Sequence, residues 1–340
     1  MKKYTVAIAG ATGMVGRTFL KVLEERSFPI GTLKLLASKR SAGSTMKFAG
    51  KEYVVEELTP ASFEGVDFAF FSAGTDISLQ MAPEAAKRGA LVIDNSNAFR
   101  MDPDVPLVVP EVNPEAVKNH KGIISNPNCS TIQMVVALYP LHKAAGLKRV
   151  VVSTYQAVSG SGKAASDGLY RESKAFMEGK EVVPENLPHG GAKRYHQIAF
   201  NLVPQLDVFV EDGYTKEEMK MVNESRKIMG IPELKITATT VRAPVENGHS
   251  ESVNVEFNKP LSVLDARKVL EEAPGVIVQD NIEELDYPMP FYVNGKDEVY
   301  VGRLRPDFSV EHGLNMWVVA DNIRKGAATN SIQIAELFIK

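Results

Sequence analysis

The glycine-rich segment near the N-terminus places the strongest constraint on the fold of this chain. The loop that contains Gly10, Gly13 and Gly16 connects an apolar stretch at residues 4–9, typical of a buried strand, to a helical pattern whose stripe runs from Val15 to Leu23. Glycines at this point allow a tight turn and let the backbone approach a pyrophosphate at the helix N-terminus. The spacing is G-x-x-G-x-x-G rather than the commoner G-x-G-x-x-G, so a glycine-rich turn without a ligand remains an alternative. Its place directly after a strand favours a dinucleotide-binding fold.

Short apolar runs continue this alternation of strand and helix. They lie at residues 33–37, 67–71, 90–94 and 122–125, and a helical segment at residues 83–88 separates two of them. Strands that are apolar throughout and alternate with helices are typical of a parallel sheet buried on both faces. We therefore expect an α/β, doubly wound N-terminal domain.

The pattern changes from about residue 147. Longer candidate strands follow at residues 149–156, 235–241, 252–257, 298–304 and 314–320. Several alternate between apolar and polar residues, which indicates a mixed or antiparallel sheet with one wetter face. The last stretch, residues 321–340, has a helical stripe formed by Ala328, Ile332, Ala335 and Ile339. We expect a second, α+β domain, and periodicity leaves open whether the last helix returns to the first domain.

Composition narrows the class of protein. A chain of 340 residues is expected to form about two domains. The net charge of −3 gives no positive field for nucleic acid or anionic lipid. No apolar run approaches the roughly 20 residues that span a bilayer. A single cysteine cannot form an intramolecular disulfide, which fits a reducing compartment, and no cluster has the spacing of a metal site. We expect a soluble protein of the cytoplasm without a metal.

The second predicted strand bears on cofactor choice. NAD-selective sites place an acidic residue about 20 positions after the glycines, where it binds the ribose 2′-hydroxyl. No acidic residue occurs between Glu25 and Glu52, and the segment SKRS stands at residues 38–41. Cations and hydroxyls suit a 2′-phosphate, so the sequence favours NADP over NAD. A solvated basic loop is the alternative.

The single cysteine, Cys129, follows the segment NPN and precedes a helical stripe. We expect its sulfur at a helix N-terminus, where backbone N–H groups favour the nucleophilic thiolate. We also expect Pro140 to kink or end that helix. An inert core cysteine is the alternative, and the position of Cys129 speaks against it.

A partner base for Cys129 must come from six histidines. His249 lies in the segment VENGHS, in the predicted connection between two strands, and Arg242 begins the same connection. Loops at strand ends are where functional sites are usually built. The remaining histidines have no such context; they are His120, His142, His189, His196 and His312.

Nine segments in order carry a resemblance to a known family. They are residues 10–16, 38–43, 94–100 (DNSNAFR), 110–113 (PEVN), 126–131 (NPNCST), 155–163 (YQAVSGSGK), 217–220 (EEMK), 242–250 (RAPVENGHS) and 321–327 (DNIRKGA). Together they resemble the aspartate-semialdehyde dehydrogenases over nearly the whole chain.

The resemblance implies a fold and an activity. The fold would be an N-terminal Rossmann-like domain, residues 1–128 plus 321–340, and a catalytic and dimerisation domain, residues 129–320. The activity would be the NADP-dependent, phosphorylating oxidation of L-aspartate 4-semialdehyde to L-aspartyl 4-phosphate through a cysteine thioester. In cells the reaction runs in reverse, in lysine (diaminopimelate), methionine and threonine biosynthesis. The enzyme would be a homodimer.

The resemblance also implies residue roles. Cys129 would be the nucleophile, His249 its acid–base partner and Gln156 the residue that orients the substrate. Ligands of the substrate and of phosphate would be Arg100, Asn128, Glu217, Lys220 and Arg242. Contacts to NADP would come from Gly10, Thr12, Gly13, Met14, Val15, Ser38, Arg40, Ser41, Ser72, Gly74, Ser159, Gly162 and Asn322.

Two other functions remain as alternatives. N-acetyl-glutamyl-phosphate reductases share the architecture and the thioester chemistry, but the segments EEMK and RAPVENGHS favour the aspartate enzyme. The second alternative is a regulator that binds NADP without catalysis. The presence of Cys129, Gln156 and His249 together speaks against it.

Overall fold

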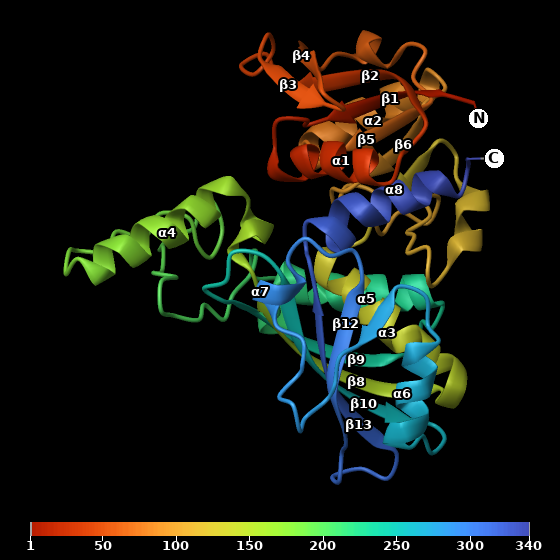
Figure 1. Cartoon of the computed structure of the whole chain (residues 1–340), viewed down its shortest axis with the longest axis vertical. Helices are drawn as coiled ribbons and strands as arrows, with labels where there is room; N and C mark the ends of the chain where they lie inside the picture. The colour runs from red at the N-terminus through yellow and green to blue at the C-terminus, as the bar shows by residue number, and fades with distance from the viewer. Residues whose placement is uncertain (1, 340) are drawn as a thin grey trace. The chain divides into compact units, whose positions relative to one another are not determined.

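The computed structural model describes residues 2–339 and divides into two compact units (Figure 1). The first unit comprises residues 1–128 and 326–340, and the second comprises residues 129–325. Met1 and Lys340, which begin and end the expected first domain, lie outside the described residues. No helix among residues 2–339 is both long and apolar enough to cross a membrane.

A seven-stranded sheet forms the centre of the first unit, in the order β3-β4-β2-β1-β5-β6-β7. Its strands are β1 (Tyr4–Ala9), β2 (Ile30–Ala37), β3 (Thr45–Phe48), β4 (Lys51–Glu57), β5 (Phe68–Phe71), β6 (Leu91–Asp94) and β7 (Ile123–Ser125). All neighbours are parallel except β3 and β4. The predicted doubly wound parallel sheet is confirmed, and the β3–β4 pair at its edge is an addition.

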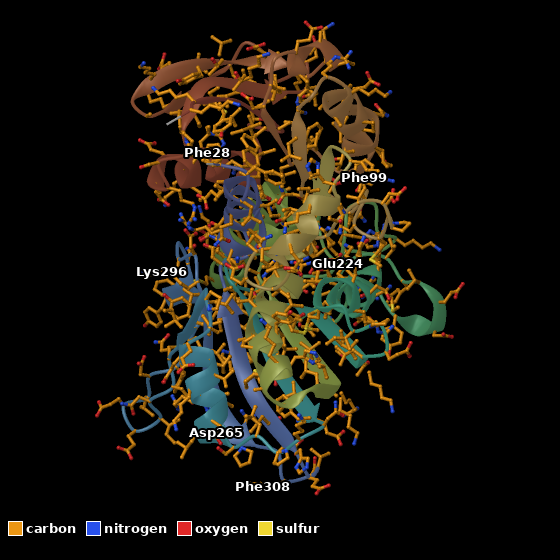
Figure 2. All side chains as sticks on the ribbon, turned by 90° about the vertical axis from the view of Figure 1, so that its right-hand side faces the viewer. Phe28, Phe99, Glu224, Asp265, Lys296 and Phe308 are labelled. Atoms are coloured by element: carbon orange, nitrogen blue, oxygen red, sulfur yellow. The ribbon has the colours of Figure 1, made fainter. Side chains whose placement is uncertain are left out.

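Helices cover both faces of this sheet. They are α1 (Met14–Glu25), α2 (Thr75–Lys87) and α8 (Thr329–Glu336), with short 3₁₀ turns at Pro60–Phe63 and Pro114–Asn119. Along β1, Val6 and Ile8 belong to one core cluster with α1 and α8, and Ala7 and Ala9 belong to another with α2. Phe28, labelled in Figure 2, lies in the first cluster. The alternation along β1 thus buries both faces of the sheet.

Two helix predictions need correction in the first unit. The helix predicted at residues 83–88 begins earlier, at Thr75, because Gly74 adopts a positive φ of 92° and turns the chain into the helix. The predicted C-terminal helix is shorter than residues 321–340, since a π-helical turn at Arg324–Ala328 precedes α8. Ala328, Ile332 and Ala335 of its predicted stripe are buried in the first unit's core.

The second unit contains a mixed six-stranded sheet in the order β11-β12-β13-β10-β8-β9. Its strands are β8 (Leu147–Gln156), β9 (Lys235–Arg242), β10 (His249–Phe257), β11 (Val276–Val278), β12 (Val299–Pro306) and β13 (Gly313–Ala320). β10 runs antiparallel to β8 and β13, and β8 is parallel to β9. The expected mixed sheet is therefore present.

Helices cover one face of this second sheet. α3 (Cys129–Ala145) packs on the central strands, α5 (Lys216–Met229) on β9, and α6 (Val263–Glu271) on β11 and β12. α4 (Lys163–Met177) extends away from the sheet, α7 (Pro290–Val293) lies near β13, and 3₁₀ turns occupy Val158–Ser161 and Glu211–Gly213 (Figure 1). The prediction that Pro140 kinks or ends its helix is wrong in one respect, since α3 continues to Ala145.

The strand register brings three strand ends to one edge of the sheet. Gln156 ends β8 beside Arg242, which ends β9. β10 runs the other way and begins at His249, next to the pair Ser250 and Tyr155. Arg242 and His249 are therefore strand residues rather than parts of the connecting loop in which they were predicted.

Candidate active site

Buried polar side chains gather at this edge of the second sheet. Gln156, Arg242 and His249 are 2%, 5% and 0% exposed. Their neighbours along each strand point alternately to the two faces, which places all three on the face that the helices cover. Polar groups at such depth require partners, and the partners define the chemistry of the site.

Cys129 is the first residue of α3, as the sequence predicts. The position favours the thiolate, because the N-terminal N–H groups of the helix and its dipole stabilise negative charge. The negative charge of Cys129 acts to raise the pKa of Arg242, against the stronger effect of burial, so these groups lie within electrostatic reach. Cys129 is partly exposed, as a reacting nucleophile must be.

His249 has a defined tautomer. Its Nδ1 accepts a hydrogen bond of 3.0 Å from the backbone N–H of Ala157. Burial and, to a smaller extent, the charge of Arg242 lower the pKa of His249 to about 3, against the opposing charge of Glu217. The imidazole is therefore neutral at pH 7, and its proton is on Nε2.

Gln156 lies between His249 and the helix α5. Its Oε1 accepts a hydrogen bond of 3.1 Å from Oγ1 of Thr154, and its Nε2 donates one of 3.1 Å to Oε1 of Glu217. The same Nε2 lies 3.4 Å from Nε2 of His249. Gln156 is thus fixed on two sides, with its amide turned toward the imidazole.

Glu217 and Lys220 lie one turn apart on α5, which starts with a capping box between Thr215 and Glu218. Nζ of Lys220 lies 3.0 Å from Oε2 of Glu217 and 3.0 Å from Oδ2 of Asp207. Burial lowers the pKa of Lys220, but the two carboxylates more than offset this and the net pKa is raised. An intrahelical ion pair is present, and Glu217 is bonded to Gln156 as well.

The guanidinium of Arg242 is held by the turn that follows β8. Nη1 donates to the carbonyl of Ala157 at 2.7 Å, and Nη2 donates to Oγ of Ser161 at 2.7 Å. Nε is buried and has no hydrogen-bond partner among residues 2–339. Burial lowers the pKa of Arg242, and the charges of Glu217 and Cys129 oppose that shift. A buried N–H without a partner is a place where an anionic ligand would bind.

The predicted cofactor residues of the second unit form a small network of their own. Nδ2 of Asn322 donates to Oγ of Ser159 at 3.0 Å, and Oδ1 of Asn322 accepts from the N–H of Gly248 at 2.9 Å. Gly162, with a φ of 87°, is the N-cap of α4. Asn322 thus joins the turn after β8 to the residue before His249.

The glycine loop of the first unit is closely packed. A Cβ on Gly10 would lie 2.3 Å from the carbonyl oxygen of Ser72, and one on Gly16 would lie 2.3 Å from the carbonyl oxygen of Gly10. Gly13 is the N-cap of α1 and offers no side chain to its first N–H groups. Three further predicted contacts lie in this turn or at the start of α1, namely Thr12, Met14 and Val15.

The other first-unit residues lie at the carboxyl ends of strands or beyond. Ser38 and Arg40 are exposed in the turn after β2, where the N–H of Ser41 donates to the carbonyl of Ser38 at 2.8 Å. Arg100 is buried and donates to the carbonyl of Asn126 at 3.0 Å and to that of Asn95 at 2.8 Å. Asn128 is also buried and directly precedes Cys129.

Comparison with known proteins identifies the family. The family model described as "Semialdehyde dehydrogenase, NAD binding domain" matches residues 5–120, and "Semialdehyde dehydrogenase, dimerisation domain" matches residues 138–325. The aspartate-semialdehyde dehydrogenase of Aquifex aeolicus is 61% identical over 340 residues, which cover 99% of this chain and 98% of the relative. The chain belongs to the aspartate-semialdehyde dehydrogenase family.

Solved structures agree with this membership. Aspartate-semialdehyde dehydrogenase II of Vibrio cholerae, described as complexed with ASA, has a TM-score of 0.94 and 47% identity, covering 100% of this chain and 99% of that one. The Candida albicans enzyme, described as bound to NADP, has a TM-score of 0.76 and 27% identity, covering 99% and 98%. The matches show the activity of the family, which is oxidoreduction of aspartate semialdehyde in amino-acid biosynthesis with a nicotinamide cofactor. They do not favour a reductase of N-acetyl-glutamyl phosphate or a non-catalytic regulator.

Several contacts at the family's site were not predicted from the sequence. Ala157 contributes only backbone atoms, and Asp207 lies in a loop distant in sequence from Lys220. Thr154 and Ser161 flank predicted residues within the segment 154–163, so a strand-end pattern could have indicated them. Residues 2–339 contain no cluster of three or more His, Cys, Asp or Glu side chains able to hold a metal ion.

Proposed function

We propose that this member of the family catalyses an NADP-dependent, phosphorylating reaction in which Cys129 is the nucleophile. L-Aspartate 4-semialdehyde, phosphate and NADP⁺ give L-aspartyl 4-phosphate and NADPH, and in cells the reaction runs toward the semialdehyde. The observation that carries the proposal is the buried group of Gln156, Glu217, Arg242 and His249 beside the helix that begins at Cys129.

The thiolate of Cys129 attacks the aldehyde carbon, forming a C–S bond and an oxyanion. The Nε2–H of neutral His249 donates to this oxyanion, and the amide of Gln156 orients the substrate beside it. NADP supplies the hydride acceptor when it is bound. The C–H bond of the former aldehyde carbon breaks as the hydride leaves, the oxyanion becomes a carbonyl, and the acyl group remains on Cys129 as a thioester that conserves the energy of the oxidation.

Arg242 and Glu217 bind the amino-acid end of the substrate. The unpartnered Nε–H of Arg242 supports this role, because a substrate carboxylate would satisfy it with a charge-assisted hydrogen bond. Glu217, already bonded to Gln156, offers a carboxylate for the ammonium group. The substrate would thus be held by opposite charges at its two ionic ends.

Phosphate completes the cycle by attacking the thioester carbonyl and releasing the thiolate of Cys129. We assign its binding to Arg100 and Lys220, with Asn128 beside the cysteine, on the basis of the segments DNSNAFR, EEMK and NPNCST. Lys220 has three N–H groups and donates to two carboxylates, so a third donor is available for an anion.

The first unit fits a dinucleotide. The tight packing of Gly10 and Gly16 keeps the turn before α1 free of side chains, and Gly13 leaves the helix N-terminus open to a pyrophosphate. Exposed Ser38 and Arg40 suit a 2′-phosphate, and Ser41 lies in the same turn. These features support NADP rather than NAD. The other contacts would be Thr12, Met14, Val15, Ser72, Gly74, Ser159, Gly162 and Asn322.

The two domains divide these tasks. We assign NADP binding to residues 1–128 and 321–340, and catalysis and dimerisation to residues 129–320. Cys129 is in no disulfide, which fits a cytoplasmic enzyme, because the proposed chemistry requires a reduced cysteine.

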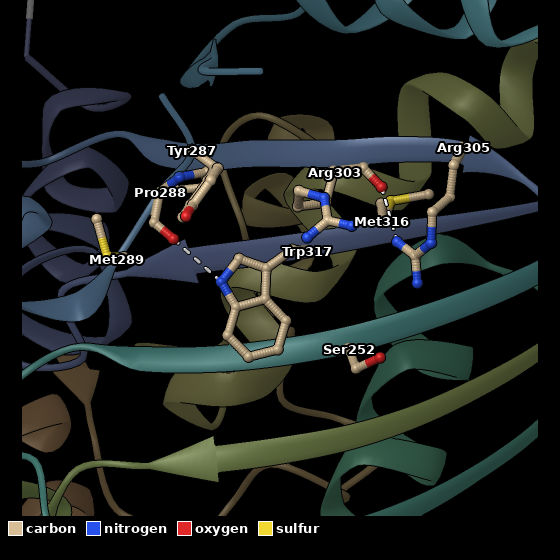
Figure 3. A pocket seen from close by; sticks show the side chains of 8 residues that line it. All are labelled: Ser252, Tyr287, Pro288, Met289, Arg303, Arg305, Met316 and Trp317. Carbon is tan, nitrogen blue, oxygen red and sulfur yellow. Dashed lines mark hydrogen bonds between the residues drawn. The ribbon is translucent and has the colours of Figure 1, made fainter. Parts of the chain in front are cut away.

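The open face of the second sheet is the proposed surface for a homodimer. It carries the ring pair Tyr155 and Trp317, 5.6 Å apart, and a pocket that Ser252 and Arg303 help to line (Figure 3). A sheet face without covering helices gains most from a second copy. Ser252→Arg should therefore shift the protein toward monomer in light scattering, and an unchanged dimer would exclude this face.

Absorbance of the reduced nicotinamide tests the proposed reaction. Purified protein is mixed with L-aspartate 4-semialdehyde, NADP⁺ and phosphate, and parallel samples omit phosphate or contain NAD⁺. We expect phosphate-dependent NADPH formation, with weaker activity on NAD⁺. Activity that ignores phosphate would contradict the acyl-phosphate step, and equal activity with NAD⁺ would contradict the role of residues 38–41.

A further inference from the structure

A further buried acid, Glu251, lies near the strand ends that carry Gln156, Arg242 and His249 in the second sheet. Glu251 is 0% exposed and lies two residues after His249 on β10, so both side chains point to the same face. Its neighbours across the sheet are Thr154 on β8 and Val318 on β13. Neither neighbour can neutralise a charge, and a fully buried carboxylate without a cation is very costly.

Gln133 links the helix of Cys129 to the strand of His249. It lies one turn after Cys129 on α3, and its Nε2 donates to the carbonyl of His249 at 3.3 Å and to that of Val318 at 3.5 Å. Because Val318 is the cross-strand neighbour of Glu251, the Gln133 amide lies over this part of the sheet. The side chain of Gln133 also acts to lower the pKa of Glu251, against the stronger effect of burial, so the two side chains are neighbours.

The buried oxygen atoms of the Gln133 and Glu251 side chains lack a hydrogen-bond donor. Oε1 of Gln133 and both carboxyl oxygens of Glu251 are buried and find no donor among residues 2–339. With an ionised carboxyl group all three of these acceptors would be unsatisfied, whereas a protonated carboxyl group is a donor. Burial raises the pKa of Glu251 well above its ordinary value, in agreement with a neutral acid. On β10, the titratable residue nearest in sequence to Glu251 is His249. On α3, the one nearest to Gln133 is Cys129.

We propose that Glu251 is a neutral carboxylic acid that donates its proton in a hydrogen bond to Oε1 of Gln133, and that this pair positions the Cys129 helix against the His249 strand. Glu251 acts through Gln133 and does not touch the substrate, so it is a positioning residue. The inference rests on the proposed roles of Cys129 and His249. The active site therefore requires a hydrogen-bond donor at position 251 and does not require a negative charge there.

Two variants at position 251 separate donor from charge. Glu251→Gln keeps a donor and cannot ionise, and we expect kcat and KM close to those of the unchanged protein. Glu251→Met has a similar length without a donor, and we expect kcat to fall on the order of tenfold or more, because small misplacements of reacting groups are costly. The pH dependence of the rate at which iodoacetamide alkylates Cys129 should change in Glu251→Met and should stay the same in Glu251→Gln.

A double variant tests the pair itself. Gln133→Met should reproduce the loss of Glu251→Met, and the combination should be no worse than either change alone. Wild-type kcat and alkylation in folded Glu251→Met would overturn the positioning role. Equal damage in Glu251→Gln and Glu251→Met would overturn the claim that a neutral donor suffices.

Protonation is tested without any substrate. Infrared difference spectra between the unchanged protein and Glu251→Gln should contain the carbonyl stretch of a protonated carboxyl group at neutral pH, and its absence would overturn the proposal. Glu251→Gln should also gain stability relative to the unchanged protein as pH rises above about 5, because the unfolded Glu251 ionises there while the raised pKa keeps the folded carboxyl group protonated. These two readouts remain interpretable if Cys129 proves not to be the nucleophile, a failure that normal activity of Cys129→Ser would reveal.

Discussion

The backbone N–H of Ala157 donates a hydrogen bond of 3.0 Å to Nδ1 of His249. A backbone amide can only donate, so Nδ1 is the acceptor and the neutral ring carries its proton on Nε2. Nε2 is also the atom that faces Gln156. A second proton on the ring would have to displace Ala157. We therefore expect His249 to act by donating from Nε2, as a neutral imidazole, rather than by storing the proton of Cys129.

Replacing His249 by Asn should change how stability depends on pH. The pKa of His249 is lowered to about 3 in the folded protein, whereas an unfolded histidine binds a proton near pH 6.5. The stability that this group contributes is therefore complete above pH 6.5 and is lost as pH falls toward 3. Between pH 6.5 and 5 the unchanged protein should lose about 2 kcal/mol of unfolding free energy relative to His249→Asn. Urea unfolding of both proteins across this range measures the difference.

His312→Asn is the matched control for that experiment. His312 is a partly exposed histidine near Glu311 in the same unit. A change in pH dependence that both variants share would not be specific to His249. A pH-independent stability difference for His249→Asn would show that the folded imidazole can be protonated after all.

Cys129→Ser should reduce turnover by several orders of magnitude and leave the fold intact. The hydroxyl of serine is not ionised at neutral pH, so the helix N-terminus has no nucleophilic anion to stabilise. Circular dichroism should match the unchanged protein, and NADPH formation from aspartate semialdehyde should fall near background. Normal turnover in a folded Ser variant would remove Cys129 from the reaction.

Arg242→Lys should raise KM for aspartate semialdehyde far more than KM for NADP⁺. Arg242 bonds both Ala157 and Ser161 and keeps Nε buried, and a lysine ammonium cannot reproduce that planar arrangement. Steady-state kinetics with each substrate varied in turn measure the effect. Arg226→Lys is the control, because Arg226 donates to the carbonyl of Leu234 rather than to a site residue. Equal KM values for the two variants would exclude Arg242 as the carboxylate ligand.

Sequence patterns predicted the parts of this protein that depend on local chemistry. The glycine turn, the helix start at Cys129 and the strand predicted at residues 252–257 all follow from local spacing, and they are present. The edge pair β3–β4 was missed because β3 has only four residues and β4 is exposed at most of its positions, so neither forms an apolar run. Pro140 was expected to interrupt a helix, but α3 is buried on most sides, and packing outweighs the lost backbone hydrogen bond.

For the candidate site, the sequence predicted which side chains take part but not how they are paired. Family motifs indicated Gln156 and Glu217, but no pattern in one sequence joins two residues 61 positions apart by a hydrogen bond. The tautomer of His249 depends on a backbone amide, which carries no sequence signal at all. Sequence thus predicts which groups are present, and the register of β8, β9 and β10 decides how they are paired.

Arg40→Ala should weaken the preference for NADP over NAD. Arg40 is exposed in the turn after β2, where its guanidinium would pair with a 2′-phosphate. We expect kcat/KM for NADP⁺ to fall by about tenfold or more and that for NAD⁺ to change little. Lys47→Ala, a change at an exposed cation of β3 in the same unit, should alter neither. A constant NADP/NAD ratio in Arg40→Ala would exclude the turn from cofactor selection.

Gly160→Ala should disturb the site through a single methyl group. Gly160 has no positive φ, so alanine is tolerated by the backbone, but its Cβ would lie 3.1 Å from Nη1 of Arg242 and 3.3 Å from Cε1 of His249. Both side chains must shift by a few tenths of an ångström, and we expect kcat/KM for aspartate semialdehyde to fall about tenfold. Gly190→Ala is the matched control, because its Cβ would meet no atom within 4 Å. Both variants should unfold within about 1 kcal/mol of the unchanged protein. Equal kcat/KM in the two variants would show that the turn after β8 adapts without moving Arg242 or His249.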